Sequence, residues 1–467
     1  MRLLHSLAKI HATFDDPNLV SRAGLVPVMA LAQRAGLAAL VDEHVRIGRP
    51  CGVNPQVKVP AIVAGMIGGA DSIDDLGLLR HGAMGALFGG LRAPSTLGSF
   101  LRSFTWGNVL QLGKVSRLVL GELARRAPLL PGKEVLAFVD IDSQQKRVYG
   151  HKKQGAGFGH TKIQGKSVLV RGLNALVATI STPLGAPVIA ATRLRGGTAN
   201  SARGAAPFVT EAVHTARATG CTGTVVVRMD SAFYSAAACG AVRRAGAFFS
   251  VTVAMNPHVR AAIAAIPEHA WTPIKYPRAG WDDQLRAWVS DAEVAETGYT
   301  AFSSKKGKAI TARLIVRRVK DLNRQAAQGQ GGLFPVWRYH AVFTDSPFVM
   351  LQAEEQHRDH AEVEQVIADW TSGPLAHLPS GLFPANAAWL ALAAISHNLL
   401  RAAGSLASLA YAKARGATIR RDLIDVAART ARHGRGHITL HLPEGWHHEQ
   451  EWLNLLQAAT GPPAQAA

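Results

Sequence analysis

The sequence contains very little cysteine. Its three cysteines are Cys51, Cys221 and Cys239. An odd number of widely spaced cysteines excludes a disulfide framework and a cysteine-based zinc module. It is typical of a protein in a reducing compartment.

The chain also lacks an apolar run that is suited to crossing a bilayer. Its most apolar segment, residues 385–412, is interrupted by His397, Asn398 and Arg401. This pattern predicts a buried core helix and no membrane binding. The apolar run at the N-terminus is short and broken by polar residues, so we expect no signal peptide and a cytoplasmic location.

Acidic residues are scarce relative to basic ones. The 467 residues include 51 Lys and Arg but only 32 Asp and Glu, which gives a net charge of +19. A protein this basic usually binds a polyanion, because its cations release condensed counterions from phosphates. Anionic membrane is the rival partner, and a GC-rich coding sequence is an alternative source of the arginines. Hydrophobic residues make up 48% of the chain, which predicts a folded protein of two or three domains.

Residues 1–130 have a helical pattern. Apolar residues recur at helical spacing between Leu25 and Leu37, and a turn then leads into a second helix that ends near Val45. Further helices follow Val57 and the capping sequence at residues 94–96. A small helical domain of this kind suits DNA binding, although the same spacing can reflect packing alone.

Residues 131–255 change to a strand-rich pattern. The expected strands cover residues 135–142, 167–180, 187–194, 224–230 and 247–254, and the expected helices cover residues 205–218 and 235–245. The order of these elements predicts an α/β fold in which a mixed sheet is flanked by helices.

The remaining chain divides into three segments. Residues 256–347 are β-rich and have a composition of their own, which is typical of an insertion. A helical pattern returns in residues 348–414. Residues 415–467 form a basic C-terminal tail with a candidate strand at residues 437–442.

Acids close two of the expected strands. Asp140 and Asp142 end the first strand and, two positions apart, lie on the same side of it. Asp230 ends another. Carboxylates at the ends of apolar strands need a cation or hydrogen-bond donors to offset their desolvation, and Mg²⁺ prefers such oxygens. Aspartates also cap turns, but two such sites in so basic a chain favour a metal site.

A third acid is expected from the helical pattern at residues 352–370. Its apolar stripe consists of Val363, Val366, Ile367 and Trp370. Glu364 borders this stripe and shares a face with His360, whereas Glu362 lies further around the helix. We therefore expect Glu364 as the third acid and keep Glu362 as the alternative.

Together, residues 136–143, 227–234 and 357–370 resemble the insertion-sequence transposases of the DDE type. The resemblance is to the branch with a β-rich insertion between the second and third acids, the transposase DDE domain group 1. It covers roughly residues 135–400 and implies an RNase H-like fold with a helical N-terminal DNA-binding domain. The catalytic acids implied are Asp142, Asp230 and Glu364, with Asp140 as a further metal ligand.

The resemblance also implies a chemistry. Two Mg²⁺ ions, for which Mn²⁺ can substitute, flank the scissile phosphate, activate water or a 3′-hydroxyl, and stabilise the leaving oxygen. The implied function is cut-and-paste transposition of an insertion sequence. Its partners are double-stranded DNA, namely terminal inverted repeats and target DNA, and a second copy of the chain when bound to the ends. We expect a nucleoid-associated protein; the alternatives are a domesticated, inactive DNA-binding protein and an RNase H-fold nuclease.

The segment around the third acid departs from the family signature of Tyr, Arg, Glu and Lys. Aligned on Glu364, the Tyr, Arg and Lys places hold His357, His360 and Thr371. Aligned on Glu362, the Arg place holds Arg358, but Glu355 and Asp369 stand in the Tyr and Lys places. We expect His360 to donate to a DNA phosphate. A zinc site formed by the two histidines and Glu364 is the less favoured reading of the same spacing.

Basic residues gather in a glycine-rich segment, residues 144–162, between the first two expected strands. They are Lys146, Arg147, Lys152, Lys153 and Lys162. Because cations bind phosphates and glycine allows the backbone to approach the strand, we expect this segment to contact DNA. A solvated hairpin is the alternative. Arg193 and Arg195, which precede a helix, are further candidates for binding phosphate.

Overall fold

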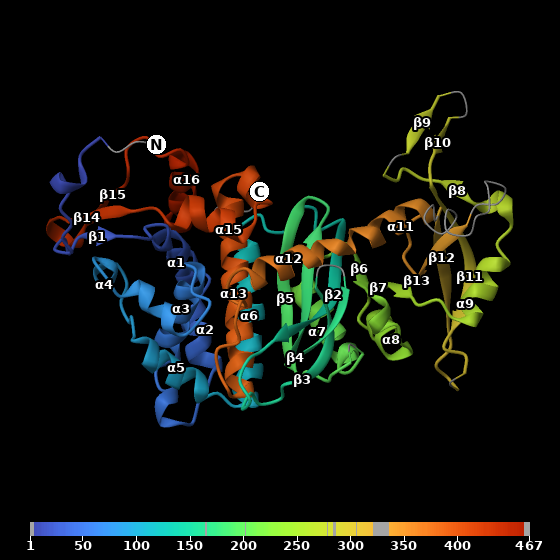
Figure 1. The fold of residues 1–467 in the computed structure, drawn as a ribbon, viewed down its shortest axis with the longest axis horizontal. Helices are drawn as coiled ribbons and strands as arrows, with labels where there is room; N and C mark the ends of the chain where they lie inside the picture. Colours follow the sequence, from blue (N-terminus) through green and yellow to red (C-terminus); the bar gives the residue numbers. More distant parts are fainter. Residues whose placement is uncertain are drawn as a thin grey trace.

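The computed structural model describes residues 4–163, 166–200, 202–277, 279–283, 286–304, 306–320 and 336–461. A helical block, a central α/β part and an inserted β-rich part follow one another along the longest axis (Figure 1). Within the described residues no single helix is long and apolar enough to span a membrane. The bent pair of helices Leu25–Arg34 and Leu37–His44 reaches that length and composition only when the two are taken together.

The helical block begins as the sequence predicts. Its helices are α1 (Leu25–Arg34), α2 (Leu37–His44), α3 (Pro55–Ile67), α4 (Met84–Leu87), α5 (Pro94–Arg102) and α6 (Trp106–Arg126). Gly36 has a φ of 74°, which allows the sharp turn between α1 and α2. Helix α5 begins at Pro94, because proline at the first helical position needs no N–H partner. Helix α6 begins with a capping box between Thr105 and Asn108.

The central part is a mixed sheet. Its strands are β2 (Leu136–Arg147), β3 (Gly157–Ile163), β4 (Lys166–Thr182), β5 (Gly185–Arg195), β6 (Thr224–Met229) and β7 (Phe248–Val253), and its helices are α7 (Ala205–Ala218) and α8 (Ala236–Arg244). In the order β5-β4-β2-β6-β7, the first three strands are antiparallel and β6 and β7 run parallel to β2. The sheet is thus mixed and flanked by helices, as the sequence predicts (Figure 1).

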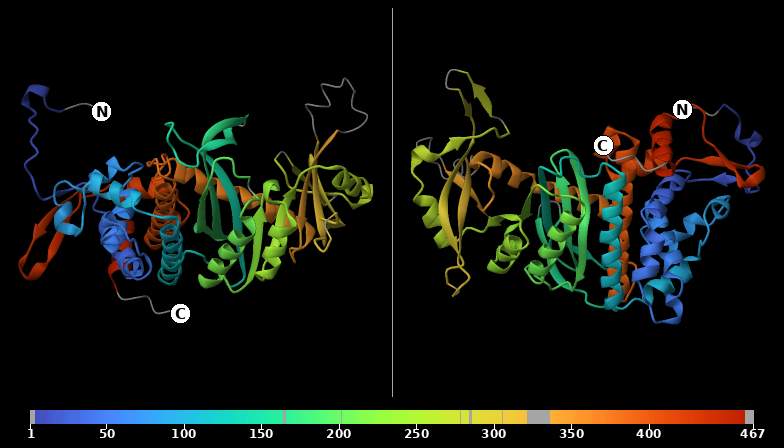
Figure 2. Two further views of the ribbon diagram at one scale, coloured as in Figure 1. Left: turned by 90° about the horizontal axis from the view of Figure 1, so that it is seen from below. Right: turned by 180° about the vertical axis from the view of Figure 1, so that it is seen from behind.

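Strand β3 lies in the glycine-rich segment for which we predicted no strand. Glycine is a poor strand former, but here it permits close approach of neighbouring backbone. A Cβ atom at Gly159 would stand 2.7 Å from the carbonyl oxygen of Gly197. The hairpin of β3 and β4 extends away from the sheet (Figure 2).

The inserted part is β-rich, as expected. It contains α9 (Pro257–Ala264), β8 (Thr272–Pro273), β9 (Gly280–Asp282), β10 (Ala287–Val289), β11 (Ala292–Ala301), β12 (Ile310–Lys320) and β13 (Trp337–Thr344). Strand β13 pairs with β7, so β13, β12, β11 and β8 extend the central sheet to ten strands within the described residues. Among the described strands of the inserted part, only β9 and β10 lie outside this sheet.

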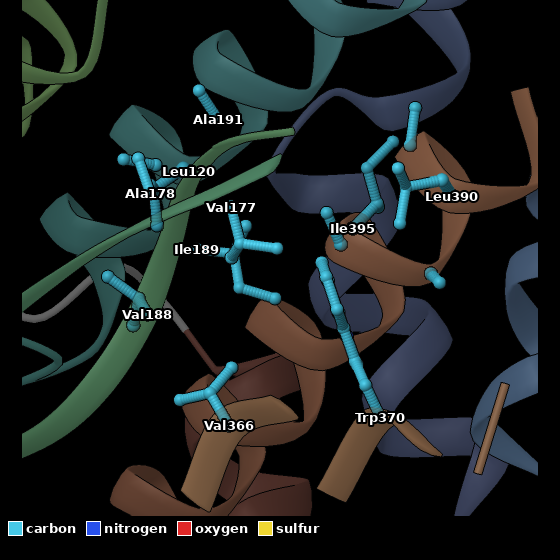
Figure 3. Packing of buried hydrophobic residues seen from close by; sticks show 14 of the residues in the cluster. Leu120, Val177, Ala178, Val188, Ile189, Ala191, Val366, Trp370, Leu390 and Ile395 are labelled. Carbon is cyan, nitrogen blue, oxygen red and sulfur yellow. The ribbon is translucent and has the colours of Figure 1, made fainter. Parts of the chain in front are cut away.

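The helix expected at residues 352–370 consists of two helices. A 3₁₀ turn, Asp359–Ala361, separates α11 (Met350–Arg358) from α12 (Glu362–Thr371). The predicted apolar stripe on α12 is buried. Figure 3 shows two of its residues, Val366 and Trp370, close to Val177 of β4 and Ile395 of the helix that follows.

That helix, α13 (Phe383–Ala407), is the buried core helix that the sequence predicts, and it lies between α6 and β5. Its polar residues have specific partners. Asn398 accepts a hydrogen bond from the backbone N–H of Ile189 at 2.7 Å and donates to its carbonyl at 2.9 Å. Arg401 donates to the carbonyl groups of Tyr411 and Ala414. The polar interruptions therefore attach α13 to the sheet and to the turn after it.

The C-terminal residues do not form a separate tail. They contain α14 (Leu409–Ala412), α15 (Gly416–Ile419), β14 (Ala428–Arg432), β15 (Ile438–His441) and α16 (Glu449–Thr460). Strand β14 pairs with β1 (Leu19–Val20), and α16 packs on α1. The C-terminal segment therefore completes the helical block (Figure 1).

Candidate active site

Strands β2 and β6 place the first two candidate acids side by side. The two strands are parallel, and their last registered pairs are Asp140 with Arg228 and Ile141 with Met229. Asp142 and Asp230 each follow by one position. Strand β6 ends at Met229, so Asp230 follows its carboxyl end and Asp142 lies beside that end on β2. Strand β2 itself continues to Arg147, so the expectation that Asp140 and Asp142 end this strand is wrong.

The electrostatics of Asp142 show that the three candidate acids are neighbours. Burial raises the pKa of this carboxyl to about 6. The backbone N–H of Ser143, which donates at 2.6 Å, and the charge of His360 oppose this rise. The charges of Asp230 and Glu364 add to it. The charges of two other acids, Asp230 after β6 and Glu364 on α12, therefore both act on Asp142 of β2.

Asp230 also caps a turn, which is the alternative to metal binding for an aspartate at the end of a strand. Its Oδ1 accepts a hydrogen bond at 3.0 Å from the backbone N–H of Ala232, at the start of the short turn Ser231–Phe233. A carboxylate has two oxygens and about four lone-pair directions. The cap therefore orients Asp230 and is compatible with metal binding.

The two candidate glutamates of α12 lie in different surroundings. Glu364 is exposed, and its charge acts on Asp142. Glu362 is half-buried; burial raises its pKa, the charge of Arg228 opposes this, and Asp140 adds to it. Glu364 is thus the glutamate whose charge acts on Asp142, and its role as the third acid stays a prediction.

Asp140 occupies a different environment from Asp142, although they are only two positions apart. Its side chain is fully buried and forms a two-pronged ion pair with Arg228, with Nε–Oδ1 at 2.6 Å and Nη2–Oδ2 at 2.7 Å. The Nδ1 atom of His360 lies 2.8 Å from the same Oδ1. Both oxygens of Asp140 are therefore engaged inside the protein, and we no longer favour it as a metal ligand.

This buried group connects β2 and β6 with the segment that precedes α12. Arg228 of β6 binds Asp140 of β2 and donates from Nη1 to the carbonyl of Gln356 in α11 at 2.6 Å. Its guanidinium also stacks on the ring of Phe138, 4.1 Å from the centroid. His360 adds the turn between α11 and α12. We call Asp140, Arg228 and His360 the clamp.

The clamp fixes the charges of its members. Burial alone would raise the pKa of Asp140 and lower that of His360. The charge of Arg228 and the contact between Asp140 and His360 outweigh burial, so the pKa of Asp140 is lowered and that of His360 is raised. Asp140 is ionised and His360 favours the protonated state.

The other histidine of the segment has a structural role. His357 is buried with Nδ1 2.8 Å from the Ser250 hydroxyl and Nε2 2.9 Å from the Thr252 hydroxyl. Burial lowers its pKa to about 3, so the ring is neutral. Both nitrogens are engaged with β7, which contradicts the zinc alternative. Among the described residues, no three His, Cys, Asp or Glu side chains already stand as a metal-ligand group.

The family of this chain follows from a match to a known protein family. Residues 4–460 match the family described as "Transposase DDE domain group 1". The chain belongs to this family. It is a DNA transposase, and the activity of the family is cleavage and transfer of DNA strands with divalent metal ions.

Comparisons with individual proteins add little detail. No curated protein matches the transposase. A solved structure that is similar is the cryo-EM structure of the piggyBac transposase synaptic complex with hairpin DNA. It shares 12% sequence identity, and the match covers 85% of this chain and 79% of that chain with a TM-score of 0.41.

The structure engages several of the basic residues expected to bind DNA in contacts within the transposase. Arg195 is buried and donates to Asn174 Oδ1, and Arg193 is ion-paired with Glu211. Lys153 donates to the carbonyl groups of Leu378 and Ser380. These three contacts satisfy the cations internally. The sequence could not reveal this, since most partners are distant along the chain.

The remaining basic candidates differ in accessibility. Lys146 is half-buried, and burial lowers its pKa. Arg147 and Lys152 are exposed, and Arg147 lies over the ring of Tyr149 at 5.1 Å. Lys162 belongs to β3, but its side chain lies outside the described part.

Sequence reasoning missed Arg228. The signal was present, because an arginine stands in the otherwise apolar strand Thr224–Met229. A charged residue in a buried strand needs a partner of opposite charge. The position two residues before Asp230 mirrors that of Asp140 before Asp142, and together they identify the pair.

Proposed function

We propose that Asp142, Asp230 and Glu364 hold the divalent metal ions with which the transposase cleaves and joins DNA. The register of β2 and β6 carries this proposal, because it places Asp142 beside Asp230. Burial raises the pKa of Asp142, and the charges of Asp230 and Glu364 add to this rise. Crowded carboxylates at an accessible sheet edge need a cation to offset their repulsion. All three offer oxygen ligands, which suit Mg²⁺.

The residues of the chain prepare this site. Backbone N–H groups of Ser143 and Ala232 orient Asp142 and Asp230. The clamp joins β2 and β6 to α11 and to the turn that precedes α12. When bound, the metal ions supply an activated water or 3′-hydroxyl and stabilise the leaving oxygen.

The finer features of the reaction belong to the same proposal. We infer two Mg²⁺ ions, replaceable by Mn²⁺, that act on the terminal inverted repeats of a mobile element and on target DNA. We further infer cut-and-paste transposition by a homodimer on the DNA ends, in association with the nucleoid. The net charge of +19 supports extensive contact with DNA.

A combined binding, cleavage and joining assay tests the proposal. Asp230→Ala should abolish Mg²⁺-dependent cleavage of element ends and leave end binding in a gel-shift assay largely intact, because affinity comes from basic residues. Mn²⁺ binding, followed by electron paramagnetic resonance, should weaken in the same variant. Cleavage by the wild type without joining would favour a nuclease. Wild-type cleavage by Asp230→Ala would refute the site.

A further inference from the structure

The hairpin of β14 and β15 has an unusual charge pattern. From residue 426 to residue 443 the chain contains three arginines and three histidines but no acid. The two strands pair antiparallel and project from the helical block (Figure 2). No role at the candidate active site uses these residues, since β2 lies away from them along the long axis (Figure 1).

The base of this hairpin is anchored, whereas its tip is open to solvent. Thr430 donates from its backbone N–H to the carbonyl of Asn18 at 2.8 Å, and Leu440 packs on the core. In contrast, every residue from Arg432 to Thr439 is exposed. An anchored ribbon with an exposed tip can enter a groove of a partner without unfolding.

The polar side chains of the hairpin are arranged by its register. Arg429 is opposite His441, so the two share one face of the ribbon. His433 lies on the same face, with Nε2 3.0 Å from the Thr439 hydroxyl. Arg435 is at the tip with a φ of 62° and a glycine on each side, which keeps the tip narrow.

The three arginines of the hairpin differ in their ion pairs. Arg429 is ion-paired with Asp16 at 3.3 Å. Among the described residues, no carboxylate pairs with Arg432 or Arg435. This contrasts with Arg193, whose charge is satisfied by Glu211.

We propose that the β14–β15 hairpin binds duplex DNA as a two-stranded ribbon, with Arg432 and Arg435 on phosphates. A two-stranded ribbon fits the major groove of B-DNA, and arginine is well suited to phosphate. A lipid surface fits less well, because Ile438 is the large apolar side chain exposed here and is only 40% exposed. The hairpin is thus a second DNA contact, separate from the candidate acids.

The test compares two arginines of the hairpin with an arginine that is held in an exposed ion pair elsewhere. DNA affinity is measured by fluorescence anisotropy on a duplex at several salt concentrations for Arg432→Ala/Arg435→Ala. Each lost phosphate contact lowers the salt slope by about 0.9. Between about 50 and about 200 mM salt, the variant should therefore lose roughly tenfold less affinity than the wild type. Arg125→Ala is the matched control, because Arg125 is 61% exposed but ion-paired with Glu122.

Further variants separate charge from folding and from catalysis. Arg432→Lys/Arg435→Lys keeps the charge and should keep the wild-type slope. If the double alanine variant does not fold, Arg435→Ala alone carries the test at the exposed tip. Cleavage at saturating DNA and low salt should be retained, which distinguishes this failure from a failure at Asp230. A slope equal to that of Arg125→Ala, or a loss confined to anionic phosphatidylserine vesicles, would overturn the proposal.

Discussion

Two carboxylate environments meet within one strand of the transposase. Asp140 is buried and neutralised by Arg228 and His360, whereas Asp142 is raised in pKa by burial and by the neighbouring acids. The clamp thus satisfies its charges within the protein, whereas Asp142 stands near two charges of its own sign, those of Asp230 and Glu364. We therefore place the proposed cation beside Asp142 and not at the clamp.

The comparison also separates stability from function. A buried ion pair is expensive to break because one charge is left without a partner. Crowded like charges, by contrast, reduce stability until a cation binds. Substitutions in the clamp should therefore affect folding, and substitutions at the candidate acids should affect metal-dependent activity.

The largest effect is expected at the third acid. Glu364→Gln keeps the shape of the side chain but removes the charge that acts on Asp142, so it should abolish Mg²⁺-dependent cleavage. Glu362→Gln is the matched control on the same helix and should keep most of the activity. Both variants should bind element ends like the wild type in a gel-shift assay. An inactive Glu362→Gln together with an active Glu364→Gln would show that the assignment on α12 is wrong.

The next largest effect is expected in the clamp. Arg228→Leu removes the partner of a fully buried carboxylate and should lower the free energy of unfolding by about 3–5 kcal/mol. Urea unfolding measures this loss. The double variant Asp140→Asn/Arg228→Leu should recover part of the stability, because no buried charge then lacks a partner. Arg125→Ala, at an exposed ion pair, should change stability by less than about 1 kcal/mol. An equal loss in Arg228→Leu and Arg125→Ala would contradict the clamp.

A substitution at Asp142 should change the free energy of unfolding in the opposite direction. Its pKa of about 6 in the folded protein exceeds the ordinary value of 3.8, so the folded state binds the proton more tightly than the unfolded state. Stability contributed by this group is therefore present at low pH and is lost as the pH rises towards 6. Asp142→Asn should stabilise the metal-free protein at neutral pH by at most about 3 kcal/mol.

The pH dependence of that difference provides its control. The advantage of Asp142→Asn should disappear below pH about 4, where Asp142 is protonated in both states. Asp140→Asn, two positions away, should instead be destabilising at neutral pH. Added Mg²⁺ should raise the melting temperature of the wild type but not that of Asp142→Asn. A destabilised Asp142→Asn at neutral pH would show that this carboxylate belongs to the structural group.

The sequence predicts one of these two environments far better than the other. Apolar runs identify β2 and β6, which are buried on both faces over most of their shared length, and apolar periodicity identifies α7 and α12. The acids next to these runs then locate Asp142 and Asp230, although β2 continues past Asp142 to Arg147. The clamp is not visible in local pattern, since Asp140 and Arg228 are 88 residues apart. The break between α11 and α12 also depends on contacts of the segment with β2 and β7.

The partners of the basic residues could not be predicted from the sequence either. A local sequence identifies where cations gather but not which carbonyl or carboxylate satisfies them. Lys153 contacts a carbonyl 225 residues away, and the partner of Arg193 lies in the following helix. Likewise, the return of the C-terminal segment to α1 depends on the pairing of β14 with β1.

The smallest expected effect distinguishes Lys152 from Lys153, adjacent residues of the same charge. Lys152 is exposed, whereas Lys153 donates to the carbonyl groups of Leu378 and Ser380. Lys152→Ala should lower the slope of DNA affinity against salt by about 0.9, the value for one phosphate contact. Lys153→Ala should leave the slope unchanged and lower the melting temperature, because it leaves two carbonyl groups without a donor. Equal slopes for Lys152→Ala and the wild type would assign this segment to a solvated loop, and a reduced slope for Lys153→Ala would show that its internal contacts open when DNA binds.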